Sequence, residues 1–105
     1  MAQFTVYKNT SPQSRKLFPY LLDVQSDLLY QLQTTVVIPL GELSDVKSQV
    51  MTTLCPIINI EGKEYAAITQ QLSSVNKKLL GPKVADLSER RFDFINAIDF
   101  IISGI

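Results

Sequence analysis

The sequence of 105 residues contains no histidine, no tryptophan and a single cysteine, Cys55. Without histidine there is no imidazole base at neutral pH, no Ser–His pair and no histidine ligand for a metal. One cysteine cannot form an internal disulfide and is too small a ligand set for structural zinc. Neither a GxGxxG motif nor a P-loop occurs. These absences leave an enzyme few catalytic groups, and they favour a protein that acts by binding, without metal or cofactor.

Charge and hydropathy lack extremes as well. Ten basic and ten acidic residues cancel, and no run of Lys or Arg occurs, which argues against direct binding to nucleic-acid phosphates. No apolar run reaches the roughly 18 residues that a membrane span requires, and the first ten residues lack the features of a signal peptide. Together with the lone cysteine, this predicts a cytoplasmic protein. The length and the 46% hydrophobic content predict one folded domain over residues 1–105.

Short alternating apolar patterns predict a body of five to seven antiparallel strands, arranged as a barrel or curled sheet. We expect strands in residues 3–9, 18–25, 34–40, 56–60, 63–68 and 75–80. The pair Glu61 and Gly62 is typical of a hairpin turn between two of them. Pro39 predicts an edge or a bulge, and Gly81 with Pro82 predicts the end of the last strand.

The apolar period becomes helical after residue 84 and stays so to residue 102. Ser88 is well placed to be the N-cap of this helix. The pattern by itself predicts that the helix packs on the sheet. Its apolar stripe is, however, wider than one small barrel can cover, and large apolar patches are rarely left exposed. The stripe therefore also predicts a symmetric dimer.

Six short segments resemble the CcdB family, the toxins of ccd toxin–antitoxin systems: FTVYKN, DVQSDLL, VVIPL, VADLS, NAI and GI. They occur in the family's order at nearly its spacing, and they cover almost the whole chain as a single CcdB-like toxin domain. The resemblance implies a mainly β fold with α, an SH3-like barrel of the CcdB/MazF/Kid type with a long C-terminal helix. It also implies a bacterial homodimer formed around these helices. We assign its interface to Ile95, Ile98, Ile101 and Ile102.

The resemblance further implies a toxin that is not itself an enzyme. Proteins of this family bind the A subunit of DNA gyrase and trap gyrase on cleaved DNA, which inhibits replication and kills the cell. A disordered C-terminal segment of the antitoxin CcdA neutralises them. DNA is met only indirectly, through gyrase or the toxin–antitoxin complex, and no membrane is involved.

In CcdB-like toxins the ends of the two C-terminal helices lie near the dimer axis and form the surface that meets gyrase. By resemblance, this surface comprises Leu28, Leu29, Tyr30, Asp99, Ile102, Ser103, Gly104 and Ile105. The family pattern has Phe-Trp before Gly-Ile where this chain has isoleucine and serine, so the chemistry of the tip differs. The loop of residues 41–53 departs most from the family, which uses loops in this area for antitoxin contacts.

Two other functions are open. An endoribonuclease toxin of the MazF/Kid type has the same fold, but it needs basic and polar groups that converge on an RNA groove. The basic residues considered for this role are dispersed along the sequence, and each is interpreted as a solvated surface charge: Arg15, Lys16, Lys47, Lys77 and Lys78. A catalytically inert member that binds only the antitoxin is the other alternative. Cys55 is predicted to be a small buried residue and not a nucleophile.

Overall fold

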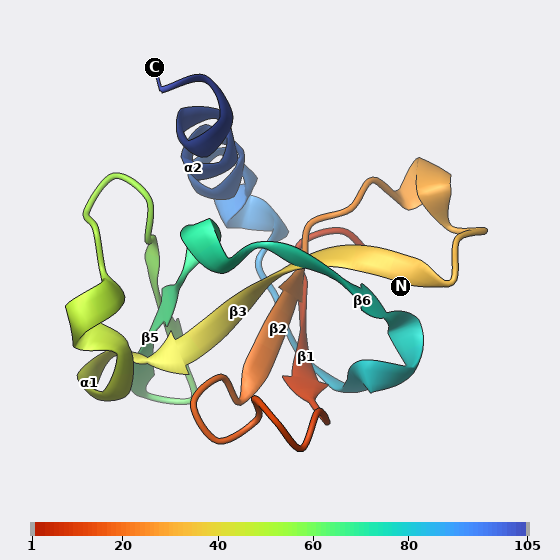
Figure 1. The fold of residues 1–105 in the computed structure, drawn as a ribbon, viewed down its shortest axis with the longest axis horizontal. Helices are drawn as coiled ribbons and strands as arrows, with labels where there is room; N and C mark the ends of the chain where they lie inside the picture. Colours follow the sequence, from red (N-terminus) through yellow and green to blue (C-terminus); the bar gives the residue numbers. More distant parts are fainter. Residues whose placement is uncertain (1, 105) are drawn as a thin grey trace.

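The computed structural model describes residues 2–104 as a curled antiparallel sheet with two helices (Figure 1). The strands are β1 (Thr5–Asn9), β2 (Tyr20–Asp23), β3 (Thr34–Glu42), β4 (Ile57–Ile60), β5 (Lys63–Ala67), β6 (Ser73–Asn76) and β7 (Leu80–Asp86). The helices are α1 (Leu43–Val46) and α2 (Arg91–Ser103). Single 3₁₀ turns are η1 (Asp27–Leu29), η2 (Lys47–Gln49), η3 (Thr69–Gln71), η4 (Lys77–Leu79) and η5 (Ser88–Arg90). The predicted fold, a mainly β half-barrel followed by a long helix, is confirmed.

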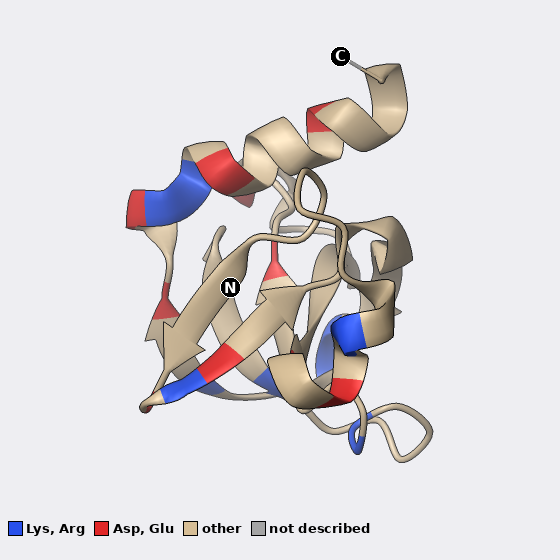
Figure 2. Ribbon diagram, turned by 90° about the vertical axis from the view of Figure 1, so that its left-hand side faces the viewer, with Lys and Arg blue, Asp and Glu red and all other residues tan. Residues whose placement is uncertain are grey.

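The sheet is organised around β3, its longest strand. The strand order is β4-β5-β3-β2-β1-β7, and β6 also pairs with β3. On one side β3 pairs with β2; on the other it pairs with β6 through residues 34–37 and with β5 through residues 40–42. The sheet curls, and α2 lies across its top (Figure 2). The curled sheet and the first turns of the helix therefore share one core.

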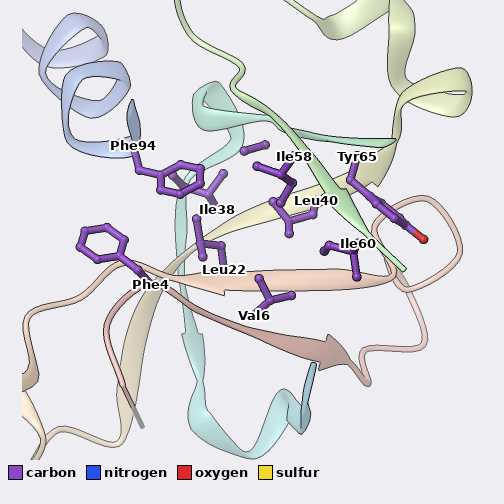
Figure 3. Close-up of a cluster of buried hydrophobic side chains, with 10 residues drawn as sticks. Phe4, Val6, Leu22, Ile38, Leu40, Ile58, Ile60, Tyr65 and Phe94 are labelled. Atoms are coloured by element: carbon purple, nitrogen blue, oxygen red, sulfur yellow. The ribbon is translucent and has the colours of Figure 1, made fainter. Parts of the chain in front are cut away.

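Alternate side chains of the strands point to the inner face of the sheet and meet the helix there (Figure 3). Val6, Leu22 and Ile38 each expose none of their surface to solvent, as the period of two along a strand predicts. Phe94 of α2 is equally buried, and its ring stacks on that of Phe4 with centroids 6.1 Å apart. Phe94 is therefore the largest side chain of α2 that is fully buried against the sheet.

A second, smaller cluster supports the helix further along. It consists of Val46, Leu54, Cys55, Ala66 and Ile68. Phe100 of α2 packs against it, so the body of the protein holds the helix as far as this residue. The predicted burial of Cys55 is confirmed, since this side chain is only 2% exposed.

The hairpin turn between β4 and β5 was correctly predicted. Glu61 and Gly62 both have positive φ, 52° and 85°, as a tight turn that matches the twist of two antiparallel strands requires. The side chain of Asn59 accepts a hydrogen bond of 3.1 Å from the backbone N–H of Gly62. Local chemistry is therefore sufficient to specify this turn.

The prediction that Pro39 marks an edge or a bulge is wrong. Pro39 lies in the central strand, in the gap between the segment of β3 that pairs with β6 and the segment that pairs with β5. Its carbonyl accepts a hydrogen bond of 3.0 Å from the N–H of Ile68, so this side of the residue faces the junction. A proline lacks a backbone donor, and Pro39 lies between the residues of β3 that pair with β6 and those that pair with β5, outside both ladders.

Gly81 and Pro82 were predicted to end a strand. They lie inside β7 instead. β7 pairs only with β1 and is therefore an edge strand, where a proline without an N–H is tolerated. The register between the two strands also shifts twice along this pair. The expected strand over residues 75–80 is in fact β6 followed by the turn η4.

Ser88 is not the N-cap of the long helix. Residues 88–90 form η5, and α2 begins only at Arg91, with Arg90 as an N-cap that makes no side-chain capping bond. The N–H of Ser88 instead donates a hydrogen bond of 2.8 Å to the carboxylate of Asp86. The turn of the chain from β7 into the helix uses this bond in place of a serine cap.

Candidate interaction site

The last turn of α2 extends beyond the rest of the fold. Ile101 is 38% exposed and Ile102 is 77% exposed, and Ser103 and Gly104 are also exposed. Figure 1 shows this end of the helix projecting beyond the sheet. Two isoleucines are thus presented to solvent at a place where their own chain offers no core to receive them.

Gly104 ends the helix. Its φ of 73° is left-handed, and its N–H donates a hydrogen bond of 2.9 Å to the carbonyl of Phe100. This geometry is a common helix C-cap and favours glycine, because a side chain there would be strained. The hydroxyl of Ser103 donates to the carbonyl of Asp99 at 2.7 Å, so the serine is satisfied within its own helix. The tip therefore has a defined shape up to residue 104.

The second exposed apolar group is the loop between β2 and β3, which includes η1. Leu28 is 88% exposed, Leu29 48% and Tyr30 70%. Ser26 caps η1 by accepting a hydrogen bond of 3.2 Å from the N–H of Leu28. Leu32, which sequence reasoning missed, is a further exposed apolar side chain of this loop, at 49%.

The residues predicted to contact gyrase thus form two separate exposed groups within one chain. Figure 1 shows the loop of η1 and the end of α2 rising from the same side of the sheet, with a wide gap between them. Asp99 is also exposed, on the helix. Ile105 lies outside the described residues. The assignment of these residues to a gyrase surface remains a prediction, which the exposure of the seven described residues permits.

The residues assigned to the dimer interface have different surroundings. Ile95 and Ile98 are partly buried and pack against the core of their own chain, whereas Ile101 and Ile102 are exposed. Residues 95, 98 and 102 follow one another at spacings of three and four, which places them on one flank of the helix. The flank is therefore continuous, half covered at its start and open at its end.

A buried carboxyl group lies at the base of the η1 loop. Asp23 is 2% exposed, and its Oδ1 accepts hydrogen bonds from the hydroxyl of Thr35 at 2.7 Å and from the N–H of Gln25 at 3.1 Å. Burial raises the pKa of the Asp23 carboxyl above its ordinary value, although the two hydrogen bonds act in the opposite direction. The group has no free approach from solvent, so its role is to hold the start of the loop.

Reactive groups do not converge elsewhere. Within residues 2–104, no three or more His, Cys, Asp or Glu side chains come together as a metal site would require. The thiol of Cys55 lies 3.2 Å from the side-chain oxygen of Gln70. Lys77, one of the dispersed basic residues, donates a hydrogen bond of 2.8 Å to the carbonyl of Tyr30. No helix in this part of the chain is long and apolar enough to cross a membrane.

Comparison with known proteins identifies the family. A family model described as "CcdB protein" matches residues 3–104. The chain belongs to the CcdB family. CcdB proteins are toxins of toxin–antitoxin systems, so this protein is a toxin of that class, and the resemblance found in the sequence is confirmed.

A solved structure gives independent support for the fold. It is described as an endoribonuclease in complex with its cognate antitoxin from a mycobacterial species. The TM-score is 0.74, and the match covers 97% of this chain and 94% of that chain at 10% sequence identity. At this identity the likeness shows a shared fold between a CcdB protein and a ribonuclease toxin, and it does not transfer the activity.

Proposed function

We propose that this CcdB protein is a gyrase poison: a homodimer that binds the A subunit of DNA gyrase and traps gyrase on cleaved DNA. The carrying observation is the pair of exposed apolar groups, at the end of α2 and on the η1 loop. Leu28 and Ile102 are 88% and 77% exposed, and large exposed aliphatic side chains on two projections of the same molecule are typical of a protein-binding surface. Such a surface is suited to binding another protein.

The dimer is supported by the flank of α2. Ile95, Ile98 and Ile102 lie along one side of the helix, and the last of them finds no partner in the described part of its own chain. A second copy of the same flank, packed around a two-fold axis, would cover it. The ends of the two helices would then come together and double the apolar tip.

An antitoxin is the second partner of the proposed function. The toxin class of the family requires one, and the solved structure with the same fold is described as a complex with its cognate antitoxin. We expect a disordered C-terminal segment of CcdA to wrap the dimer. Such a segment pays its ordering entropy on binding but can cover a large surface.

Chemical grounds favour binding over hydrolysis. The chain has no histidine, and the carboxyl of Asp23 is buried and engaged by Thr35. Lys77 holds a backbone carbonyl, and Arg90 makes an ion pair of 3.0 Å with Asp93. These groups are engaged within the structure of the chain, which makes them poor candidates for general acid–base chemistry on RNA.

The test incubates the purified protein with supercoiled DNA, with and without gyrase, and separately with RNA. We expect linear DNA only where gyrase is present, and intact RNA. RNA cleavage without gyrase would contradict the proposal and indicate the MazF/Kid-type endoribonuclease. A protein that binds CcdA but yields neither product would be the inert, antitoxin-binding member.

Sedimentation tests the dimer separately. At micromolar concentration the protein should have about twice the mass of one 11.8 kDa chain. Ile102→Asp should shift it toward the monomer, because it places a carboxylate in the proposed interface. Asn96→Asp is the matched control, since residue 96 is exposed on the opposite flank of the helix, and it should leave the dimer intact. A folded wild-type monomer would contradict the shared-helix interface.

A further inference from the structure

The η1 loop presents large apolar side chains on ten residues, 24–33, that include only one 3₁₀ turn. A loop of this kind is costly to use as a binding surface, because ordering it on association consumes part of the interaction free energy. The cost falls when the free protein already holds the loop in its binding shape. The contacts at the two legs of the loop decide whether it does.

The first leg is held by two carboxylates. Asp23 accepts a buried hydrogen bond of 2.7 Å from Thr35. Asp27 accepts one of 2.8 Å from the backbone N–H of Gln3. The start of the loop is thereby tied both to β3 and to the segment before β1.

The second leg is held by a single residue from a distant part of the sequence. The backbone N–H of Lys77 donates to the carbonyl of Gln33 at 2.9 Å, and its ammonium Nζ donates to the carbonyl of Tyr30 at 2.8 Å. Within residues 2–104, no other side chain makes a hydrogen bond to residues 30–33. Lys77 therefore holds the second leg at two points.

Two hollows border Lys77 and the loop. One, lined by Tyr30, Leu32, Gln33 and Lys77 among others, is open and has a volume of about 400 Å³. The other, lined by Asp23, Asp27, Leu29, Tyr30 and Lys77 among others, has a volume of only about 10 Å³. Roughly that volume is needed to admit one water molecule. Lys77 thus forms one wall of a nearly filled space, and the backbone of Tyr30 rests on it.

We propose that Lys77 is a positioning residue that preorganises the η1 loop, so that Leu28, Leu29 and Tyr30 face the partner protein in a fixed arrangement. The inference rests on the proposed function for the identity of that partner, gyrase A. Lys77 touches Tyr30 through the backbone and acts through the shape of the loop. The tertiary contact spans 47 positions of sequence, and no sequence pattern announces it.

The experiment compares Lys77→Met with Lys78→Met. Methionine keeps an unbranched side chain but removes the ammonium donor, and the backbone bond to Gln33 is retained. Lys78 is the adjacent exposed lysine, with no side-chain bond to the loop, so it controls for the loss of one charge. Lys77→Arg keeps a cationic donor and should rescue the loss.

Two readouts follow. Hydrogen exchange reports the amides of Leu29 and Leu32, which donate within the loop to Ser26 at 3.0 Å and to Leu29 at 3.1 Å; both should exchange faster only in Lys77→Met. Affinity for gyrase A should fall about tenfold in Lys77→Met, the order expected for a lost charged hydrogen bond, and less than twofold in Lys78→Met. Melting temperatures should stay close to that of the wild type.

The outcomes separate the two claims. Unchanged exchange in Lys77→Met would show that the side chain of Lys77 does not hold the loop. Faster exchange with unchanged affinity would overturn the positioning role. Failure of the wild type to bind gyrase A would overturn gyrase A as the partner and hence the positioning role toward it. The exchange data would still show whether Lys77 holds the loop. If Lys77→Met does not fold, Lys77→Gln, which shortens the donor's reach, takes its place in both measurements.

Discussion

The two ends of α2 carry side chains of the same kind in opposite surroundings. Phe94, in its first turns, is fully buried against the sheet, whereas Ile102, in its last turn, is 77% exposed. Phe100 marks the change, since it is the last residue of the helix that packs on a buried cluster. The first part of the helix is therefore explained by the stability of the chain, and the proposed partner would explain the last turn.

The β2–β3 loop repeats this division on a smaller scale. Its base holds the buried carboxyl of Asp23, and its tip exposes Leu28 and Tyr30. In both places a segment that is anchored by buried side chains ends in exposed apolar side chains. Substitutions at the anchored parts should therefore change folding, and substitutions at the ends should change binding.

The largest effect is expected at the anchored part of the helix. Phe94→Ala should lower the free energy of unfolding by about 3–5 kcal/mol, the usual cost of removing a buried phenylalanine ring. Phe92→Ala is the matched control, because Phe92 is 69% exposed and surface changes usually stay within about 0.5 kcal/mol. Denaturant unfolding measures both. Equal losses in the two variants would break the comparison.

Deletion of Gly104 and Ile105 tests the tip. It should abolish killing while folding and binding to CcdA remain largely intact. The loss of a hot spot costs about 2 kcal/mol or more of binding, a factor of roughly thirty in affinity, and a dimer would lose two copies. The fold should lose no more than about 0.5–1 kcal/mol. A truncated protein that kills at equal soluble level would show that the tip does not bind the target.

Asp23→Asn tests the base of the loop through pH. Because the folded-state pKa of Asp23 is raised, the folded protein binds this proton more tightly, and stability falls as pH rises from the ordinary carboxyl value through the raised one. Asparagine removes this fall and keeps an oxygen for Thr35. The variant should therefore gain stability relative to the wild type at neutral pH but not below about pH 4. Unfolding curves at several pH values measure the difference, and a loss at neutral pH would contradict the account.

Asp86→Asn should change the pH dependence of stability in the opposite direction. Hydrogen bonds from the backbone and side chain of Ser88 lower the pKa of Asp86 below its ordinary value of 3.8. Its contribution is therefore present above the ordinary value and lost as pH falls through the lowered one. This variant should lose stability at neutral pH, and the difference should vanish in strong acid. Parallel pH profiles for the two variants would be inconsistent with these environments.

The smallest effect is expected for Ser103→Ala. The hydroxyl of Ser103 is already bonded to the carbonyl of Asp99, and a satisfied, exposed serine offers a partner little. Killing and gyrase affinity should change less than about twofold, which corresponds to less than about 0.5 kcal/mol. A large loss would mean that this hydroxyl turns to a specific acceptor on the partner.

Local patterns predicted much of the fold. Alternation identified β1 and β2, a run of β-branched apolar residues identified β3, and the pair Glu61 and Gly62 identified the hairpin, because these signals depend on neighbours in sequence. Pro39 was misplaced because its tolerance depends on which strands lie beside β3. The start of α2 was misplaced because residues 88–90 form the 3₁₀ turn η5 and the helix begins only at Arg91.

The candidate site was predictable only in part. The resemblance supplied Leu28 and Ile102, and the structure shows both exposed. Helical periodicity places Phe92 and Phe94 on different faces, since residues two positions apart do not share a face, and they face solvent and core respectively. The contact of Lys77 with Tyr30 depends on the tertiary fold, because the pairing of β6 with β3 brings η4 beside the loop.

The central claim, that the exposed ends serve to bind gyrase A, is tested most directly by expressing the toxin in cells that carry variant gyrase-A subunits. We expect that a single substitution in gyrase A, at a site that leaves gyrase active, abolishes killing by the wild-type toxin at unchanged toxin level. Undiminished killing across all such variants, together with loss of cellular RNA, would contradict it.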